Sequence, residues 1–323
     1  MRACAAFAST GGFKLERAIR SFRRTEPDLP VLVAVDASSR TWQNMVAAGI
    51  GITQELSPGW KPPAFQANEE GHLKKFDCRY RNIVNTAYIN GMMNAAMRMA
   101  QDDGFDLVAL FHDDVVFPVV SSSLIAINDL TLWLRWAEKH AGEFSGLTLS
   151  LIQAFVPGTW ARPPAEWDAL DLEGEGFWRE LMAHLPAEGM AIAGSKELEA
   201  ASRHDFPAMG FFVYYYRPTA VCPWPRLGPT GQIVPVEAWR RAGGFDETDG
   251  IFYDIGYAAE CRRRGLPPVL AVPSVPHLHL HNQSIGFADP ARGIWGDTIG
   301  AFQRRYGVSW EQFREEVGSC ASS

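Results

Sequence analysis

One short segment limits the fold of this chain more than any other. Residues 107–111 read Leu-Val-Ala-Leu-Phe, an unbroken apolar run that ends at His112, Asp113 and Asp114. A strand without polar alternation is typical of a parallel sheet that is covered by helices on both faces. The sequence therefore predicts an α/β fold with a mostly parallel, Rossmann-like central sheet flanked by helices, and a polar cluster at the carboxyl end of a buried strand.

The amino-terminal residues predict the first βαβ unit of this sheet. Residues 3–8 are an apolar strand candidate, apolar side chains recur with helical spacing over 15–22, and 29–35 are a second apolar run before Asp36. A further helix is predicted over 82–99. Because strands that alternate with helices form parallel sheets, Asp36 is expected at a carboxyl edge, as is the polar cluster.

Composition disfavours two classes of protein. The chain has 323 residues, 47% of them hydrophobic, and its 30 Lys plus Arg against 37 Asp plus Glu give a formal charge of −7. Nucleic acid is disfavoured as the main ligand, because no basic excess would attract a polyanion. No apolar stretch reaches the roughly 18 residues that a membrane span needs. Five scattered cysteines without a CxxC spacing fit a reducing compartment, so we expect a soluble, cytoplasmic protein.

Three acidic residues follow predicted strands and are candidate ligand-binding groups. Neighbouring side chains at a strand end point in different directions, so Asp113 and Asp114 can contact different groups of one ligand, one of them through a divalent cation. Asp36 can accept hydrogen bonds from the ribose or base of a nucleotide. Each acid also has a simpler explanation, because Asp residues commonly cap helices and form turns.

The region after residue 242 contains the densest polar pattern. Residues 243–247 read Gly-Gly-Phe-Asp-Glu, and Asp254 stands at the start of a predicted helix that ends at Gly265. The helix dipole favours an ionised carboxylate at that position, and such a carboxylate can accept a proton from an incoming hydroxyl. A helix N-cap worth about 1 kcal/mol is the alternative explanation.

A segment with alternating histidines and leucines follows. His277, His279 and His281 fall on one face of the strand predicted over 276–281. Imidazoles in such a row are metal-ligand candidates, but alternate residues lie about 6.5 to 7 Å apart, so one or two of them at most bind the same ion. A zinc hydrolase with this motif would need further ligands that the sequence does not mark.

Taken in chain order, these residues resemble the nucleotide-sugar glycosyltransferases of the GT-A type, and among them the large inverting family 2. That family has an acid after the second strand, a DxD-like motif after the fourth, a Gly-Gly-Phe-Asp-Glu segment, an acid that heads a helix, and a metal-binding histidine. The corresponding residues here are Asp36, Asp113 with Asp114, 243–247, Asp254, and His279 with His281 beside it. The resemblance covers roughly residues 3–118 and 228–286.

Two positions depart from the family pattern. His112 replaces the outer acid of the DxD motif, a variant that resembles bacterial rhamnosyltransferase-like members. Tyr253 stands where the family usually has the Glu of a Glu-Asp pair. The metal-binding histidine is assigned to His279, while the spacing to Ser284 leaves His281 open.

The resemblance implies a GT-A fold and a donor site around a divalent cation. Mn²⁺ or Mg²⁺ would be held by Asp114 and by His279 or His281, next to the diphosphate of the donor. Asp113 and Asp36 would hold its ribose and base.

The resemblance also implies that Asp254 is the general base, which deprotonates an acceptor hydroxyl that attacks with inversion at the anomeric carbon. Arg81 belongs to a basic stretch over 74–81 and is a candidate for the diphosphate, with a solvated surface charge as the alternative. Trp224, between two prolines, is a candidate for stacking on an acceptor sugar, although core packing also explains it.

Three parts of the chain are expected to differ in role. Residues 1–118 form the donor-binding half, 119–210 a helical insertion of unassigned role, and 211–323 the acceptor-binding and catalytic half with a carboxyl-terminal helix. The implied partners are a nucleoside-diphosphate sugar and a sugar, glycan or small-molecule acceptor. Two other functions stay open, namely a nucleotidyltransferase that makes nucleotide sugars and a non-catalytic protein that binds nucleotides or carbohydrates.

Overall fold

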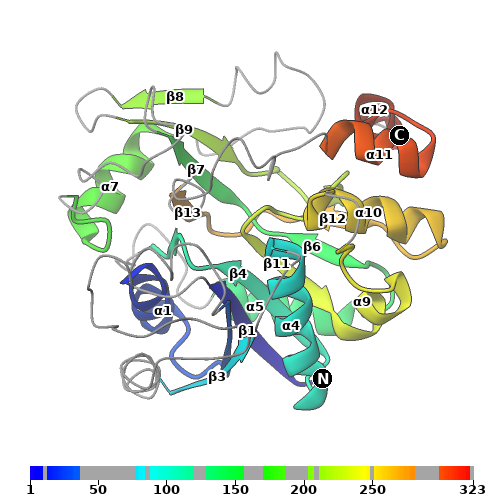
Figure 1. Cartoon of the computed structure of the whole chain (residues 1–323). Helices are drawn as coiled ribbons and strands as arrows, with labels where there is room; N and C mark the ends of the chain where they lie inside the picture. The colour runs from blue at the N-terminus through cyan, green and yellow to red at the C-terminus, as the bar shows by residue number, and fades with distance from the viewer. Residues whose placement is uncertain are drawn as a thin grey trace, which may run out of the picture.

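Two β-sheets with helices packed around them make up the computed structural model of the chain (Figure 1). The structure describes residues 1–9, 13–36, 77–83, 88–118, 129–155, 170–185, 203–206, 211–247, 251–280 and 298–320. The eight-stranded sheet contains, in spatial order, β10 (Cys222–Pro223), β12 (Val269–Ala271), β6 (Gly146–Thr148), β11 (Gly231–Pro235), β4 (Leu107–His112), β1 (Ala3–Ser9), β2 (Val31–Asp36) and β3 (Cys78–Ile83). The five-stranded sheet contains β5 (Val115–Val116), β13 (His277–Leu280), β7 (Leu151–Phe155), β9 (Phe211–Tyr216) and β8 (Arg203–Phe206).

The larger sheet has a parallel centre. Strand β1 pairs in parallel with both β2 and β4, and β2 pairs in parallel with β3. Strand β11 then runs antiparallel beside β4 and is followed by β6. The carboxyl ends of β1, β2 and β4 therefore meet at one sheet edge, and the predicted α/β fold with a mostly parallel central sheet is confirmed.

Helices cover both faces of this sheet, as the apolar run in β4 predicts. One face packs against α4 (Tyr88–Asp102), α9 (Val236–Ala242) and α10 (Tyr253–Arg263), and the other packs against α1 (Phe13–Thr25) and α5 (Asp129–Lys139). Alternate residues of β4 enter the two cores, Val108 and Leu110 on the first face and Ala109 and Phe111 on the second. Figure 1 shows α1 and α4 on opposite sides of β1 and β4.

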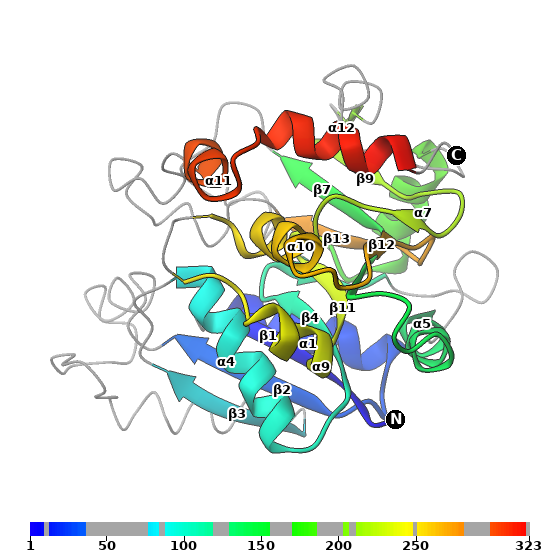
Figure 2. The same cartoon turned by 90° about the vertical axis from the view of Figure 1, so that its right-hand side faces the viewer.

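The five-stranded sheet has a core of its own. The helix α7 (Glu175–His184) buries Trp178 and Leu181 in a cluster that also contains Leu278 and Leu280 of β13. Figure 2 shows β7 and β9 of this sheet on one side of the molecule and β1, β2 and β3 on the other.

A small helical core completes the described chain. The helices α11 (Thr298–Tyr306) and α12 (Trp310–Cys320) pack Phe302, Trp310 and Phe313 against Ile251 and Ala259 at the start and middle of the α10 region. The carboxyl-terminal helices thereby support the helix that carries Asp254.

Two expectations about local structure need correction. The helix predicted over 82–99 begins at Tyr88, and 78–83 form the edge strand β3 instead. The side chains of Cys78, Arg79, Tyr80 and Arg81 alternate between half-buried and exposed, which is the period-two pattern of a strand with one covered face.

The segment 119–210, expected to be a helical insertion, contains strands as well as helices. Its described residues supply β6 to the larger sheet and β7 and β8 to the smaller one, beside α5 and α7. These strands are short, and their pairing partners lie far away in the sequence, so neither length nor local periodicity marks them.

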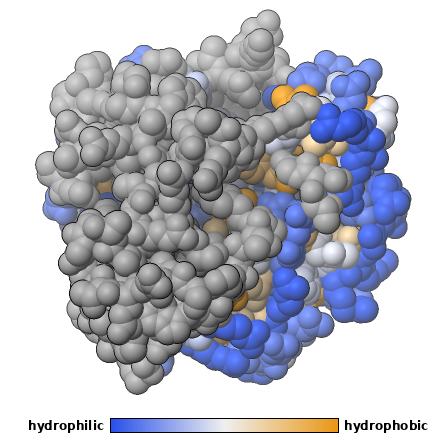
Figure 3. All heavy atoms as spheres, viewed as in Figure 1, coloured by the Kyte–Doolittle hydropathy of each residue, from blue (hydrophilic) through white to orange (hydrophobic). Residues whose placement is uncertain are grey.

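The described surface gives no sign of a large apolar patch. Its exposed large hydrophobic side chains are Met1, Leu132, Val221 and Ile299, which lie far apart in the sequence. Figure 3 shows mainly hydrophilic side chains along the described rim of one face. Within the described ranges, no helix is both long enough and apolar enough to cross a bilayer.

The two sheets approach closely where Gly231 of β11 faces His277 of β13. A Cβ atom at Gly231 would overlap the ring of His277, which is itself 2% exposed. The ring is held in place by Thr230, whose Oγ1 lies 3.0 Å from Nε2. A side chain at position 231 therefore forces one of two packed layers to move.

We expect Gly231→Ala to lower the free energy of unfolding by about 1 to 3 kcal/mol, because overpacking a filled site displaces its neighbours. Urea unfolding followed by circular dichroism measures this loss. Gly176→Ala in α7 is the matched control, because nothing lies within 4 Å of its added Cβ. The control is expected to leave stability unchanged or to raise it by up to about 1 kcal/mol. Equal effects of the two substitutions would show that the approach at Gly231 is not tight.

Candidate metal centre

The turn after β4 brings residues from the two sheets together. Strand β4 ends at His112, Asp114 lies in the following turn, and β5 begins at Val115. In the smaller sheet, His279 of β13 is paired with Val115, and the backbone N–H of Leu280 donates to the carbonyl of Asp114 at 2.9 Å. This pairing places the side chain of His279 next to the end of β4.

His112, Asp114 and His279 form a three-residue cluster. One ligand atom from each lies within 4.8 Å of the ligand atoms of the other two. His279 Nε2 is 3.5 Å and His112 Nδ1 is 3.9 Å from Asp114 Oδ1. The two imidazole rings are nearly perpendicular, at 86°. Two nitrogens and one carboxylate oxygen are a donor set that suits a divalent transition-metal ion.

The chemistry of these groups fits a cation. Asp114 is 4% exposed, and its Oδ1 has no hydrogen-bond partner among the described residues. A buried carboxylate oxygen in that state is costly unless an ion or another group satisfies it. Burial lowers the pKa of His112 to about 4, so its imidazole is neutral at pH 7 and carries a lone pair for a metal.

The carboxyl group of Asp114 is favoured in its ionised form. Burial by itself would raise its pKa, but the imidazoles of His279 and His112 lower it below its usual range. A carboxylate must be ionised to bind a metal ion, and Asp114 meets this condition between the two imidazoles.

The three alternating histidines have different surroundings. His279 belongs to the cluster, His277 is bonded to Thr230, and His281 lies outside the described residues. Burial lowers the pKa of His277 to about 3, and its ring stacks on Phe117 and meets Phe111 edge-on. The structure therefore places His277 in the packing between the sheets.

His112 is the residue that sequence reasoning missed as a ligand. In the sequence comparison, His112 stands where the DxD-like motif has its outer acid. That position identifies the residue but does not give it a role. The signal that could have identified it is chemical, because an imidazole is a common metal ligand at a position where an acid also binds metal.

Asp113 has a different environment from Asp114. It is 2% exposed, its Oδ2 accepts a hydrogen bond from Ser9 Oγ at 2.7 Å, and its Oδ1 lies 3.7 Å from Lys14 Nζ. The carboxylate thus ties the turn after β4 to the end of β1 and the start of α1. This contact gives Asp113 a structural role, and the predicted contact with a nucleotide stays a prediction.

The other candidates for nucleotide and acceptor binding are not members of the three-residue cluster. Asp36 ends β2, and its side chain lies outside the described residues. Arg81 is paired with Asp102, 3.1 Å away, at the end of α4 from which the chain enters β4. Trp224 is 9% exposed and packs in the core beneath α9 and α10. Their predicted contacts with donor and acceptor stay predictions.

The start of α10 lies beside the three-residue cluster. The hydroxyl of Tyr253 is 3.2 Å from His112 Nε2, and Asp254 follows it in the first turn. Asp254 is 5% exposed. Burial raises the pKa of its carboxyl, which the positive charge of Arg226 partly offsets. Backbone hydrogen bonds at the start of α10 also lower this pKa, so the helix start favours the ionised carboxylate, while burial opposes it.

Arg226 is a second residue that sequence reasoning missed. It is half-buried, and its charge acts on both Tyr253 and Asp254. Among the described residues, its guanidinium makes no hydrogen bond or ion pair. Its proximity to Tyr253 and Asp254 comes from folding, because Arg226 lies in an irregular segment without a local motif.

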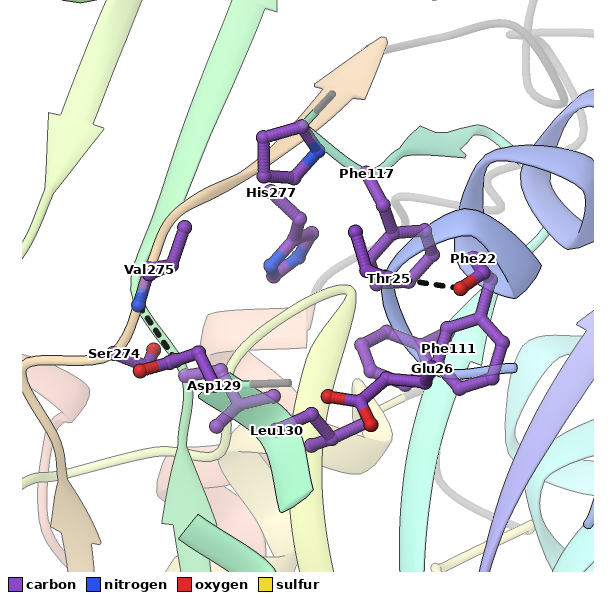
Figure 4. A pocket seen from close by; sticks show the side chains of 12 residues that line it. Phe22, Thr25, Glu26, Phe111, Phe117, Asp129, Leu130, Ser274, Val275 and His277 are labelled. Atoms are coloured by element: carbon purple, nitrogen blue, oxygen red, sulfur yellow. Dashed lines mark hydrogen bonds between the residues drawn. The ribbon is translucent and has the colours of Figure 1, made fainter. Parts of the chain in front are cut away.

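A pocket between α1, α5 and β13 is separate from the cluster (Figure 4). Its apolar walls include Phe111 and Phe117, and His277 lines it. Its two acids are both engaged in structure. Glu26 accepts hydrogen bonds from the first turn of α5, and Asp129 accepts one from the backbone just before β13. The cluster residues do not line this pocket.

Comparison with known proteins gives structural likeness only. No protein-family model and no curated protein matches this chain. A structure of S. aureus TarS is 9% identical to this chain, with a TM-score of 0.49. The match covers 98% of this chain and 42% of the TarS chain. Its residues 1-349 in complex with UDP-GlcNAc share 10% identity at 0.47, over 100% of this chain and 72% of that one. A structure of GalNAc-T7 with UDP, GalNAc and Mn²⁺ is 12% identical, with a TM-score of 0.46. The match covers 98% of this chain and 54% of the GalNAc-T7 chain.

This chain therefore spans less than half the length of the full TarS chain. At identities and TM-scores this low, the likeness assigns neither a family nor an activity to it.

We expect Asp113→Ala to lower the free energy of unfolding by about 2 to 4 kcal/mol, because it leaves the buried Lys14 and Ser9 without their carboxylate. Chemical denaturation of the metal-free protein measures the change. Asp102→Ala removes a carboxylate from an exposed pair and should cost less than about 1 kcal/mol. The structural role of Asp113 is refuted if both variants lose the same amount.

Proposed function

We propose that this protein is a metal-dependent glycosyltransferase of the GT-A type, which moves a sugar from a nucleoside-diphosphate sugar to an acceptor hydroxyl with inversion. The observation that carries the proposal is the meeting of His112, Asp114 and His279 at the carboxyl edge of the parallel sheet, in contact with Tyr253 in the helix turn that also carries the buried Asp254. Ligands of α/β sheets bind at that edge. The motifs that resemble inverting family 2, and within it the rhamnosyltransferase-like variant with His112, point to the same chemistry.

The cluster would hold a divalent cation, Mn²⁺ or Mg²⁺. Two imidazole ligands suit Mn²⁺ better than Mg²⁺, which prefers oxygen ligands and retains water. A bound cation supplies positive charge beside the leaving diphosphate. The ligands of this chain are His112, Asp114 and His279, and His281 stays a further candidate that lies outside the described residues.

Asp254 is proposed as the general base. Its carboxylate would accept the proton of the acceptor hydroxyl while that oxygen attacks the anomeric carbon from the face opposite the leaving diphosphate, which inverts the configuration. Because burial raises its pKa, the carboxylate binds a proton more strongly than an exposed aspartate does. Arg226 lies close enough to act electrostatically on Asp254, and its guanidinium is suited to a phosphate or carboxylate group of the bound molecules.

The remaining assignments complete the proposal. Asp36, Asp113 and Arg81 are proposed contacts of the nucleotide sugar. Trp224 is the proposed contact of the acceptor, which belongs to the class of sugars, glycans or small hydroxyl-bearing molecules. A cytoplasmic location belongs to the proposal, because Cys4, Cys78, Cys222 and Cys261 form no disulfide.

A release assay separates this activity from the two alternatives. Incubation with a nucleotide sugar and Mn²⁺, without pyrophosphate, should release nucleoside diphosphate slowly even without an acceptor. A nucleotidyltransferase would need pyrophosphate or a nucleoside triphosphate. A non-catalytic binding protein would bind nucleotide sugar and release nothing with any acceptor.

We expect Asp114→Ala to abolish the Mn²⁺ dependence of nucleotide binding, because it removes the only carboxylate of the cluster. Titration calorimetry with UDP, GDP and dTDP, each with and without Mn²⁺, measures the effect and identifies the donor base. Asp28→Ala, at an exposed turn far from the cluster in sequence, is the control and should retain the dependence. An unchanged Mn²⁺ effect in Asp114→Ala would place the ion elsewhere.

We expect Asp254→Asn to leave donor affinity within about twofold but to lower turnover on the order of 100-fold or more, because the amide cannot accept the proton. In the wild type, turnover should fall as the pH drops through a pKa above the usual aspartate value of about 4, because burial raises the pKa of Asp254. Turnover of the variant equal to that of the wild type would remove Asp254 as the base.

A further inference from the structure

The hydroxyl of Tyr253 is surrounded by polar atoms although the residue is 2% exposed. Its oxygen lies 2.6 Å from the carbonyl oxygen of Pro229 and 3.3 Å from that of Gly228. It lies 3.2 Å from His112 Nε2 and 3.4 Å from the side-chain nitrogen of Gln232. The hydroxyl thus connects the first turn of α10 to a ligand of the metal cluster.

The positions of these atoms decide where the protons lie. A backbone carbonyl can only accept a hydrogen bond, so the single hydroxyl proton of Tyr253 is donated to Pro229, its nearest partner. The lone pairs of the oxygen are then left for donors, and His112 Nε2 must carry a proton to bond to it. A neutral imidazole has one N–H, so the other nitrogen, Nδ1, keeps its lone pair.

That free nitrogen is the one that faces the cluster. His112 Nδ1 lies 3.9 Å from Asp114 Oδ1, and the ring centroid of His279 is 6.2 Å from that of His112. Ligating histidines commonly donate their second N–H to a fixed acceptor, which sets both the tautomer and the orientation of the ring. The backbone carbonyl of Pro229 holds Tyr253, and Tyr253 in turn holds His112.

We propose that Tyr253 is a positioning residue, which fixes His112 as the Nε2–H tautomer and so presents Nδ1 to the metal. The inference rests on the proposed metal-dependent function. It also joins the two departures from the glycosyltransferase pattern, because the histidine that replaces an acid and the tyrosine that replaces a glutamate are in contact. A histidine ligand needs an acceptor for its second N–H, whereas an acid at the same position would not.

The aromatic ring of Tyr253 also packs, so its packing role must be separated from its hydroxyl. The ring meets Phe245 edge-on at a centroid distance of 5.3 Å. Tyr257, one turn further along α10, provides a matched control. It is fully buried, packs on the same Phe245 at 5.2 Å, and donates its hydroxyl to the carbonyl of Ser145 at 2.9 Å, away from His112.

The first experiment measures the tautomer of His112 without metal. Long-range proton–nitrogen NMR spectra of the histidine-labelled full chain distinguish the two neutral forms, and the His112→Ala spectrum assigns the signal. The wild type should show the Nε2–H form, and Tyr253→Phe should show a mixture, while Tyr257→Phe should match the wild type. An Nδ1–H form of His112 in the wild type would overturn the inference.

The second experiment measures binding of Mn²⁺ by the electron paramagnetic resonance of free Mn²⁺. Tyr253→Phe should weaken binding about 10-fold, whereas Tyr257→Phe should bind as the wild type does. In a His112→Ala background, Tyr253→Phe should have no further effect, because the positioning acts through the imidazole. The same loss in both backgrounds would overturn the inference.

The two experiments separate the two levels of the proposal. If the wild type binds no Mn²⁺, the metal-dependent function falls together with the positioning role at a metal. If the wild type binds Mn²⁺ and Tyr253→Phe binds it equally well, only the positioning role falls.

Discussion

The candidate site depends on a turn that belongs to both sheets. Strand β4 is central in the larger sheet, and β5, which starts three residues after β4 ends, is the edge strand of the smaller one. The two carboxylates in this turn face different partners. Asp113 bonds toward β1 and α1, and Asp114 faces β13. The pairing of β5 with β13 is therefore the constraint that places His279 next to Asp114, although the two residues are far apart in the sequence.

The parts of the fold that local pattern controls could be predicted from the sequence. The apolar run of β4 fills two cores with alternate residues, and the repeat at Leu15, Ala18 and Ile19 is the buried face of α1. The alternation of β13 sends its leucines into the core of the smaller sheet and its histidines to the opposite face. In each case, the spacing of apolar residues within one element indicates which of its faces is buried.

The remaining parts depend on contacts between distant segments. Edge strand β3 has too few apolar residues to be distinguished from the start of a helix, and β6 is only three residues long. In the candidate site, the acids at strand ends and the histidine row could be identified from sequence. The sequence does not show that Asp113 accepts a hydrogen bond from Ser9 and pairs with Lys14, or that Arg226 lies near Asp254. These neighbours come from other parts of the chain.

The origin of the cluster in both sheets has a mechanical consequence. His112 ends a strand of one sheet and His279 lies within a strand of the other, so the distance between their nitrogens varies with the spacing of the two layers. Any ion bound by both of these side chains would link the two sheets, and its binding free energy would add to the stability of the folded protein. A change in the spacing of the two sheets would in turn weaken binding of that ion, because the ligands would move apart.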